Sequence, residues 1–350
     1  MTDKTDLKSM TREELELLLA GWGEAKFRAG QLFEWLHGKR ARSFDEMTNL
    51  SKPLRQKLQE SCYINGLEAK RILEAQDGTA KFLFRLRDGN TVESVLMAHD
   101  YGNSLRISSQ VGCRMGCGFC ASTIGGKVRD LAASELLDQV YEAGRLSGKR
   151  IDSVVLMGIG EPLDNFGAVL RFLTLVRDPK GLGLSHRHIS LSTCGLCEEI
   201  DRLADEKLQI TLSVSLHAAD DETRDRIMPV NRKYKIGRLM QSCRRYFEIT
   251  GRRVSYEYAL IGGVNDGLET ARKLAALLRG QNCHVNLIPV NPVAETPYRR
   301  GSRKSAEAFR AELERLGLAA TIRREMGTEI DAACGQLRRK DREEEDGCAS

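Results

Sequence analysis

The sequence lacks an apolar run long enough to cross a membrane. Its longest apolar stretches, such as "SVVLMGIG" at residues 153–160, are far shorter than the roughly 20 residues that a membrane-spanning helix needs. The opening segment "MTDKTDLKSMTREEL" is charged throughout and has no apolar core of the kind that secretory signals contain. We therefore expect a cytoplasmic protein that does not contact a membrane.

A strong excess of one charge is also absent. The 54 lysines and arginines exceed the 49 acidic residues by only 5, which permits a nucleic-acid partner without indicating one. Basic runs occur at 37–42, 243–253 and 298–304, and each alone is typical of a solvated face. Together they leave room for a surface that follows a phosphate backbone.

A fourth metal ligand is missing beside the most closely spaced cysteines. The segment "CRMGCGFC" places Cys113, Cys117 and Cys120 in one loop that contains no other cysteine or histidine. A structural zinc ion usually takes four ligands in two separated pairs, so zinc is the weaker interpretation. A four-iron cubane held by three thiolates keeps one iron open to a substrate or cofactor, so we favour a [4Fe–4S] cluster.

The hydrophobic pattern divides the chain into a helical start, a β segment and an alternating α/β core. Capping boxes at Thr11 and Ser43 predict short helices in the first sixty residues, and turn signals at 77–79 and 88–90 separate three strands. Further strands are expected at 104–109, 153–158, 188–193, 209–216, 254–260 and 284–289, with helices between them. This alternation predicts a parallel sheet, open or closed into a partial barrel, with ligands at the carboxyl ends of its strands.

Several motifs resemble those of one enzyme family. The cysteine triplet resembles the signature of radical S-adenosylmethionine (SAM) enzymes, whose open iron binds SAM. The similarity to the RlmN family extends along nearly the whole chain through these segments: "MGIGEPLDN" (157–165), "SLSTCG" (190–195), "VSLHA" (214–218), "NLIPVNP" (286–292) and "IDAACGQL" (330–337). Those enzymes methylate adenosine C2 in 23S rRNA, at the peptidyl transferase centre, and in tRNA, beside the anticodon.

The resemblance implies a fold, cofactors and partners. The fold is a partial (βα)6 radical SAM barrel with an N-terminal helical domain and a small antiparallel β extension. The implied divisions are an RNA-binding helical domain (1–63), the β extension (64–103), the radical SAM core (104–342) and a polar tail (343–350). The implied cofactors are a [4Fe–4S] cluster and SAM, two molecules per turnover. A flavodoxin-type electron donor is implied as well, and nothing in the sequence demands more than a monomer.

Seven residues at expected strand ends match family positions that bind SAM. The glycine-rich turn of "MGIGEP" and the lone histidine of "VSLHA" would by themselves indicate an ordinary turn and a core histidine. Within the resemblance they are implied to contact SAM, together with neighbouring strand-end residues. The implied set is Gly160, Glu161, Ser192, Ser215, Leu216, His217 and Asn291.

The resemblance also assigns two residues to the chemistry. Adenine C2 is electron-poor and does not attack the methyl group of SAM. In the family, one SAM methylates a cysteine, here Cys334, and a radical from the second SAM activates that methyl group for addition to C2. Glu93 matches the family's proton acceptor and shares a strand face with Val95 and Met97 in "TVESVLM", so the resemblance implies a buried carboxyl, although the pattern alone favours an exposed one. An exposed glutamate on an edge strand is the alternative.

One position departs from the family pattern. The cysteine that resolves the RNA–enzyme adduct lies seven residues before the first cluster cysteine, where this chain has Arg106. We therefore hypothesise that resolution is impaired, rerouted or carried out by another thiol, such as Cys194 or Cys197. Two alternative functions follow: an adenine-C8 methyltransferase of the Cfr type, and an RNA-binding paralogue impaired in turnover.

Overall fold

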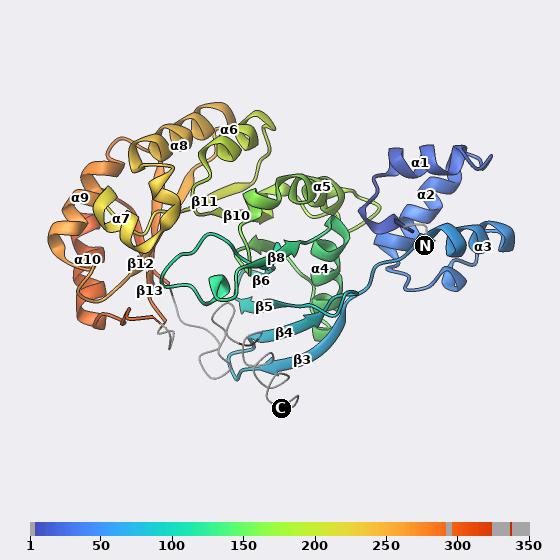
Figure 1. Cartoon of the computed structure of the whole chain (residues 1–350), viewed down its shortest axis with the longest axis horizontal. Helices are drawn as coiled ribbons and strands as arrows, with labels where there is room; N and C mark the ends of the chain where they lie inside the picture. Colours follow the sequence, from blue (N-terminus) through green and yellow to red (C-terminus); the bar gives the residue numbers. More distant parts are fainter. Residues whose placement is uncertain (1–3, 292–295, 324–336, 338–350) are drawn as a thin grey trace.

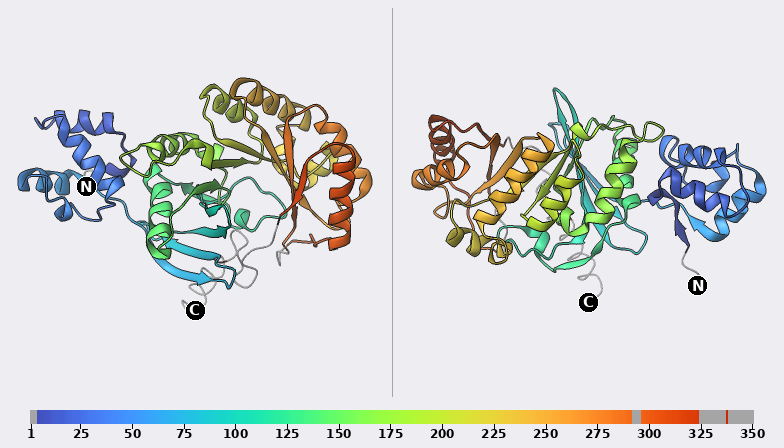
Figure 2. Two further views of the ribbon diagram at one scale, coloured as in Figure 1. Left: turned by 180° about the vertical axis from the view of Figure 1, so that it is seen from behind. Right: turned by 90° about the horizontal axis from the view of Figure 1, so that it is seen from above.

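The computed structural model describes residues 4–291, 296–323 and Leu337. The N-terminal helices form a lobe at one end of the molecule, as Figures 1 and 2 show: α1 (Arg12–Ala20), α2 (Phe27–Phe33) and α3 (Lys52–Ser61). The capping boxes expected at Thr11 and Ser43 are both confirmed, because each side chain and a glutamate three residues later satisfy backbone N–H groups reciprocally. Strand β1 (Thr5–Asp6) pairs with β2 (Cys62–Tyr63), so the two ends of the lobe are held together.

A single ten-stranded sheet forms the centre of the protein. Its order is β14-β13-β12-β11-β10-β9-β6-β5-β4-β3, antiparallel from β3 to β6 and parallel from β6 to β14. The antiparallel part comprises β3 (Glu68–Glu74), β4 (Ala80–Arg85), β5 (Thr91–His99) and β6 (Gly102–Arg106). The parallel part continues with β9 (Ser153–Leu156), β10 (Ile189–Thr193), β11 (Thr211–Ser215), β12 (Val254–Leu260), β13 (Cys283–Pro289) and β14 (Ala320–Ile322). The predicted α/β class is confirmed.

The sequence prediction of the strands was wrong at several places, including the following two. Strand β14 was not expected, and β6 ends at Arg106 instead of residue 109. Beyond Arg106 the chain leaves the sheet because the backbone of Ser108 bonds to the side chain of Gln139: its N–H donates to Oε1 at 2.8 Å and its carbonyl accepts from Nε2 at 3.0 Å. The β extension is continuous with the core, since β5 pairs with β6.

The two faces of the sheet differ in chemistry because side chains alternate along each strand. One face packs against helices in an apolar core, with Leu105, Val154, Leu191, Leu212, Tyr256 and Leu287 among its members. Those helices are α4 (Ala133–Ser147), α5 (Phe166–Arg177), α6 (Cys197–Asp205), α8 (Ile236–Thr250), α9 (Leu268–Leu278) and α10 (Arg303–Arg315). The opposite face, called the inner face below, carries Arg106, Ser190, Ser192, Ser213, Ser215, Glu257 and Asn286 on paired positions. Figure 1 shows the helices outside the curved sheet.

A buried ion pair joins the N-terminal lobe to the core. Lys8 Nζ lies 2.6 Å from Asp138 Oδ1 of α4, and both side chains are at least 96% buried. Asn65 Nδ2 donates to the other oxygen of Asp138 at 2.8 Å. Burial raises the pKa of Asp138 to about 6, even though Lys8 and Asn65 favour the charged carboxylate.

In the described part of the chain, no helix combines the length and apolar character that crossing a membrane requires.

Candidate active site

The cysteine loop connects the two strands of a small sheet that is separate from the central one. Strand β7 (Gln110–Gly112) pairs with β8 (Lys127–Asp130), and the loop between them carries the three cysteines. Gly112 has φ of +79°, and a Cβ there would lie 1.9 Å from the carbonyl oxygen of Gly126, so only glycine fits. The N–H of Cys113 donates to that same carbonyl at 3.1 Å, which closes the base of the loop.

The three thiols lie within electrostatic range of one another in apolar surroundings. Cys117 packs with Met115, Phe119 and a small cluster of buried residues that includes Ile227 and Met228. Burial raises the pKa of Cys113 to about 12, and burial followed by the neighbouring thiols raises that of Cys117. Metal-free thiols are therefore protonated, and binding of a metal centre would displace their protons.

The donor set fits an iron–sulfur cluster. Three sulfur donors come from one loop, and soft thiolate ligands suit such clusters. Among the described residues no three cysteine, histidine, aspartate or glutamate side chains converge closely enough to hold a metal ion. A four-iron cubane holds its cysteine ligands farther apart than a single metal ion does. The separation of the three thiols is therefore compatible with such a cluster.

The "MGIGEP" segment packs directly against the strand that leads into the cysteine loop. A Cβ on Gly158 would lie 2.5 Å from the carbonyl oxygen of Ile107, and one on Gly160 would lie 2.6 Å from Gln110 Cβ. Gly160 also has φ of +106°, which side chains rarely allow. The N–H of Glu161 donates to Gln110 Oε1 at 2.9 Å, so the two segments are held in register.

Glu161 is buried and bonded to backbone groups. Its Oε1 accepts from the N–H of Leu163 at 3.1 Å, and its Oε2 accepts from the N–H of Cys194 at 2.7 Å. Burial raises its pKa, while these hydrogen bonds act in the opposite direction. The carboxyl thus braces the end of β9 against the end of β10, and it lies within electrostatic range of Cys113 and Cys117.

A buried arginine that the sequence analysis missed ties two further strand ends together. Arg224 of α7 (Asp221–Ile227) is fully buried, and its Nε donates to the carbonyl of Leu216 at 3.0 Å. Its Nη2 donates to the carbonyls of Ser215 at 3.1 Å and Cys194 at 2.7 Å. The charged segment "DDETRDR" is typical of an exposed helix, so no local pattern predicted that Arg224 is buried.

His217 follows β11 with an unusual backbone conformation. Its φ is +56°, its side chain is buried, and its Nδ1 accepts from the N–H of Ala259 at 2.9 Å. Burial lowers its pKa to about 3, so the ring is neutral and carries its proton on Nε2. The ring meets that of Phe119 edge-on at 4.9 Å between centroids, which places His217 against the cysteine loop.

Glu93 is buried on β5, and the alternative of an exposed edge position is wrong. It is 2% exposed, and its Oε2 lies 3.1 Å from Lys81 Nζ of β4, which is fully buried. The two side chains thus form a buried ion pair between neighbouring strands. The carbonyl of Glu93 accepts from Ser108 Oγ at 2.7 Å, and Ser108 Oγ in turn accepts from the N–H of Ile159 at 3.1 Å.

The remaining predicted residues lie at various distances from this centre. Ser192 is half-buried on the inner face, while Asn291 is exposed just beyond β13. Cys334 lies outside the described residues. Cys194 is buried in the apolar cluster that includes Cys117, and Cys197 is buried where α6 begins. The structure thus brings together the cysteine loop, the Glu161 turn and His217.

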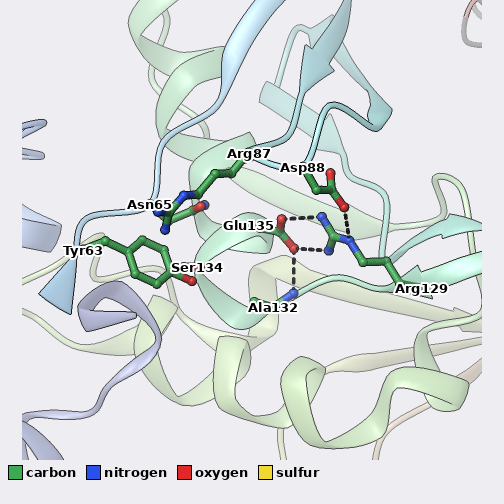
Figure 3. A pocket seen from close by; sticks show the side chains of 8 residues that line it. All are labelled: Tyr63, Asn65, Arg87, Asp88, Arg129, Ala132, Ser134 and Glu135. Atoms are coloured by element: carbon green, nitrogen blue, oxygen red, sulfur yellow. Dashed lines mark hydrogen bonds and ion pairs between the residues drawn. The ribbon is translucent and has the colours of Figure 1, made fainter. Parts of the chain in front are cut away.

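A separate cavity lies where the N-terminal lobe meets the core. It measures about 390 Å³ and is lined by polar side chains, as Figure 3 shows. Arg129 donates to both oxygens of Glu135 at 2.8 Å and to Asp88 at 2.6 Å. Arg87 lies over the ring of Tyr63 at 4.2 Å from its centroid. These cations are already engaged by neighbouring groups, and none of the predicted site residues that the structure describes lines the cavity.

Comparisons with known proteins match both parts of the chain. A model of the ribosomal RNA large subunit methyltransferase N-terminal domain matches residues 5–64, and a model of the radical SAM superfamily matches residues 107–275. A probable dual-specificity RNA methyltransferase RlmN of Lachnospira eligens is 54% identical, over 98% of this chain and 99% of that protein. A protein of the same name from Staphylococcus aureus strain Newman is 51% identical, over 98% and 95% respectively.

The crystal structure of a radical SAM methyltransferase from Sphaerobacter thermophilus has the same fold. It superimposes with a TM-score of 0.89 at 42% identity, covering 95% of this chain and 98% of that chain. The expected radical SAM fold is therefore confirmed, and the superfamily's cofactors are a [4Fe–4S] cluster and SAM. At this level of identity over nearly its whole length, the chain belongs to the RlmN family.

Proposed function

We propose that this protein is a radical SAM methyltransferase that forms 2-methyladenosine in 23S rRNA and in tRNA. One observation carries the proposal: a loop with three cysteines lies beside the Glu161 turn in a chain that belongs to the RlmN family. The names of its relatives favour this function over C8 methylation and over a paralogue without turnover. Ribosomal and transfer RNA are cytoplasmic molecules, which supports a cytoplasmic enzyme.

Cys113, Cys117 and Cys120 would hold the cluster, and the strand ends beside them would receive SAM. The cluster and SAM supply the one-electron chemistry that activates a methyl group. Gly160 allows its turn to pack closely against Gln110 beside the cysteine loop, and His217 offers a neutral Nε2–H donor. The other strand-end residues proposed to contact SAM are Glu161, Ser192, Ser215, Leu216 and Asn291.

Glu93 is the proposed acceptor of the adenosine C2 proton, and Cys334 the proposed carrier of the methyl group. The ion pair with Lys81 Nζ at 3.1 Å fixes the position of the Glu93 carboxyl, as a positioned proton acceptor requires. Burial of that pair excludes water, so the proton acceptor is shielded from solvent. A flavodoxin-type protein is the proposed electron donor, and we propose that the enzyme acts as a monomer.

Mass spectrometry of nuclease-digested RNA tests the proposed function. RNA from cells with the gene should contain 2-methyladenosine in 23S rRNA and tRNA, and RNA from cells without it should lack this nucleoside. Cells that carry the Cys120→Ala variant should match the deletion, whereas Cys243→Ala, a buried cysteine of α8, should match the wild type. Detection of 8-methyladenosine instead, or no change on deletion, would overturn the proposal.

A second test addresses Arg106 at the usual position of the resolving cysteine. The purified, anaerobically reconstituted protein is incubated with SAM, reductant and an RNA fragment, and the products are separated on denaturing gels. A stable RNA–protein crosslink that disappears in Arg106→Cys would support impaired resolution. Multiple turnovers without any crosslink would refute it.

A further inference from the structure

Arg106 is a buried cation whose hydrogen-bond donors are not used by the described protein. Its side chain ends β6 on the inner face and is 8% exposed. The described residues offer its Nε no hydrogen-bond partner, and they form no ion pair with its guanidinium within 4 Å. Burying an arginine without partners is unfavourable, so such a group is typically retained for a ligand.

A carboxyl group faces Arg106 from the other side of the inner face. Glu257 of β12 is 5% exposed and lies within electrostatic range of the guanidinium. Three strands, β9, β10 and β11, lie between the two residues in the sheet order, so the pair spans the curved inner face instead of joining neighbours. Asn286 Nδ2 donates to Glu257 Oε2 at 2.7 Å, and the hydroxyls of Ser255 and Ser213 also donate to this carboxyl. The two carboxyl oxygens have about four acceptor sites, so one remains for a ligand.

A donor and an acceptor that face each other without touching suit a ligand that carries both functions. A phosphate or carboxylate would satisfy Arg106, but it would bring a second negative group towards Glu257. The Watson–Crick edge of adenine presents a ring nitrogen, N1, as acceptor and the N6 amino group as donor. Proteins that recognise single-stranded RNA commonly receive a splayed-out base in this way.

We propose that Arg106 and Glu257 recognise the target base, with Arg106 donating to N1 of adenine and Glu257 accepting from the N6 amino group. The inference rests on the proposed function, because it takes adenosine in RNA as the substrate. A donor at N1 withdraws electron density from the adjacent C2, the atom to be methylated. Arg106 occupies the position of the family's adduct-resolving cysteine, and in this chain that position thus determines substrate specificity.

Binding of modified RNA hairpins tests this assignment. The full chain, with its cluster reconstituted anaerobically, is titrated with a fluorescent hairpin that carries adenosine, 1-deazaadenosine, purine riboside or an abasic site at the target position. For the wild type, loss of N1 or of the amino group should each weaken binding about tenfold. Arg106→Met should weaken binding of the adenosine hairpin about tenfold and cause no further loss with 1-deazaadenosine. Arg272→Met, on outer helix α9, is the matched control and should change nothing.

Three results would overturn the inference while leaving the proposed function intact. Equal binding of the adenosine and 1-deazaadenosine hairpins by the wild type is the first, and it does not depend on whether Arg106→Met or the milder Arg106→Gln folds. The second is an Arg106→Met defect that persists with the abasic hairpin and lowers the salt dependence of binding by about one counterion, which indicates a phosphate contact. The third is weaker binding of SAM by Arg106→Met than by the wild type in the absence of RNA. If the wild type bound none of the hairpins, the proposed function itself would fall, and the inference with it.

Discussion

Removing Lys8 should strongly destabilise the N-terminal lobe. Raising the pKa of Asp138 from 3.8 to about 6 corresponds to about 3 kcal/mol against its charged form, even with Lys8 present. Without Lys8 the buried carboxylate would keep, among the described residues, only Asn65 as a hydrogen-bond partner. We expect Lys8→Met to lower the free energy of unfolding by about 3–5 kcal/mol, the usual cost of breaking a buried pair.

The loss of stability can be measured by the fluorescence of the N-terminal lobe. Both tryptophans of the chain, Trp22 and Trp35, lie in this lobe, so intrinsic fluorescence during urea unfolding reports on it. The double variant Lys8→Met/Asp138→Asn should recover most of the loss, because it removes the unpaired charge. Lys26→Met is the matched control: its ion pair with Glu16 is exposed, so the change should stay below about 1 kcal/mol.

The pH dependence gives an independent check with a defined sign. Because the pKa of Asp138 is raised in the folded state, its contribution to stability falls as pH rises from 3.8 through about 6. The loss caused by Lys8→Met should therefore be smaller at pH 5 than at pH 8, where Asp138 is charged. A loss below about 1 kcal/mol, or a double variant as unstable as the sum of the single ones, would refute the reasoning.

Three further predictions follow from the site and the core. Gly160→Ala should weaken SAM binding about tenfold in equilibrium dialysis, because the added Cβ would lie 2.6 Å from the side chain of Gln110. Gly167→Ala, whose Cβ would lie in open space, should bind SAM normally. Equal binding of SAM by the two variants would contradict this. Arg224→Met leaves strand-end carbonyls unsatisfied and should lower the free energy of unfolding by about 3 kcal/mol or more in urea titrations, and an unchanged midpoint would contradict the clamp. Burial lowers the pKa of His37 to about 3, so the stability that the neutral ring contributes is lost as pH falls from 6.5 towards 3. His37→Phe should therefore remove about 2 kcal/mol of the destabilisation that the wild type shows at pH 5. An unchanged acid sensitivity of the free energy of unfolding would argue against this.

The sequence predicted the elements whose patterns are local. Helix caps at Thr11 and Ser43 and most parallel strands followed from side-chain chemistry and alternation within a few residues. Burial of Glu93 was implied by the family resemblance, because the pattern of its segment alone favoured an exposed position. In the structure β5 lies between β4 and β6, and the first six of its residues are all buried. Strand β14 was missed because three residues after a helix carry no period of their own.

Contacts between distant segments could not be predicted in the same way. The burial of Arg224 depends on carbonyls from two strand ends and a loop that meet only in the folded sheet. The Lys81–Glu93 pair depends on the hairpin register of β4 and β5. The turn signal at 88–90 predicts the hairpin, but it does not show which side chain pairs with Glu93. Arg106 Nε has no hydrogen-bond partner among the described residues, and this is a property of a whole face of the sheet that only the three-dimensional structure shows.

The hydroxyl group of Ser108 has a consequence for how one centre serves two RNAs. By bonding both to the strand of Glu93 and to the segment that carries Gly160, it makes the proton acceptor and the cofactor turn parts of one rigid body. Such preorganisation means that the reacting groups need no rearrangement when substrate arrives. Ribosomal and transfer RNA would then have to deliver their adenosines in one common pose, with adaptation confined to the RNA and to the surfaces that grip it.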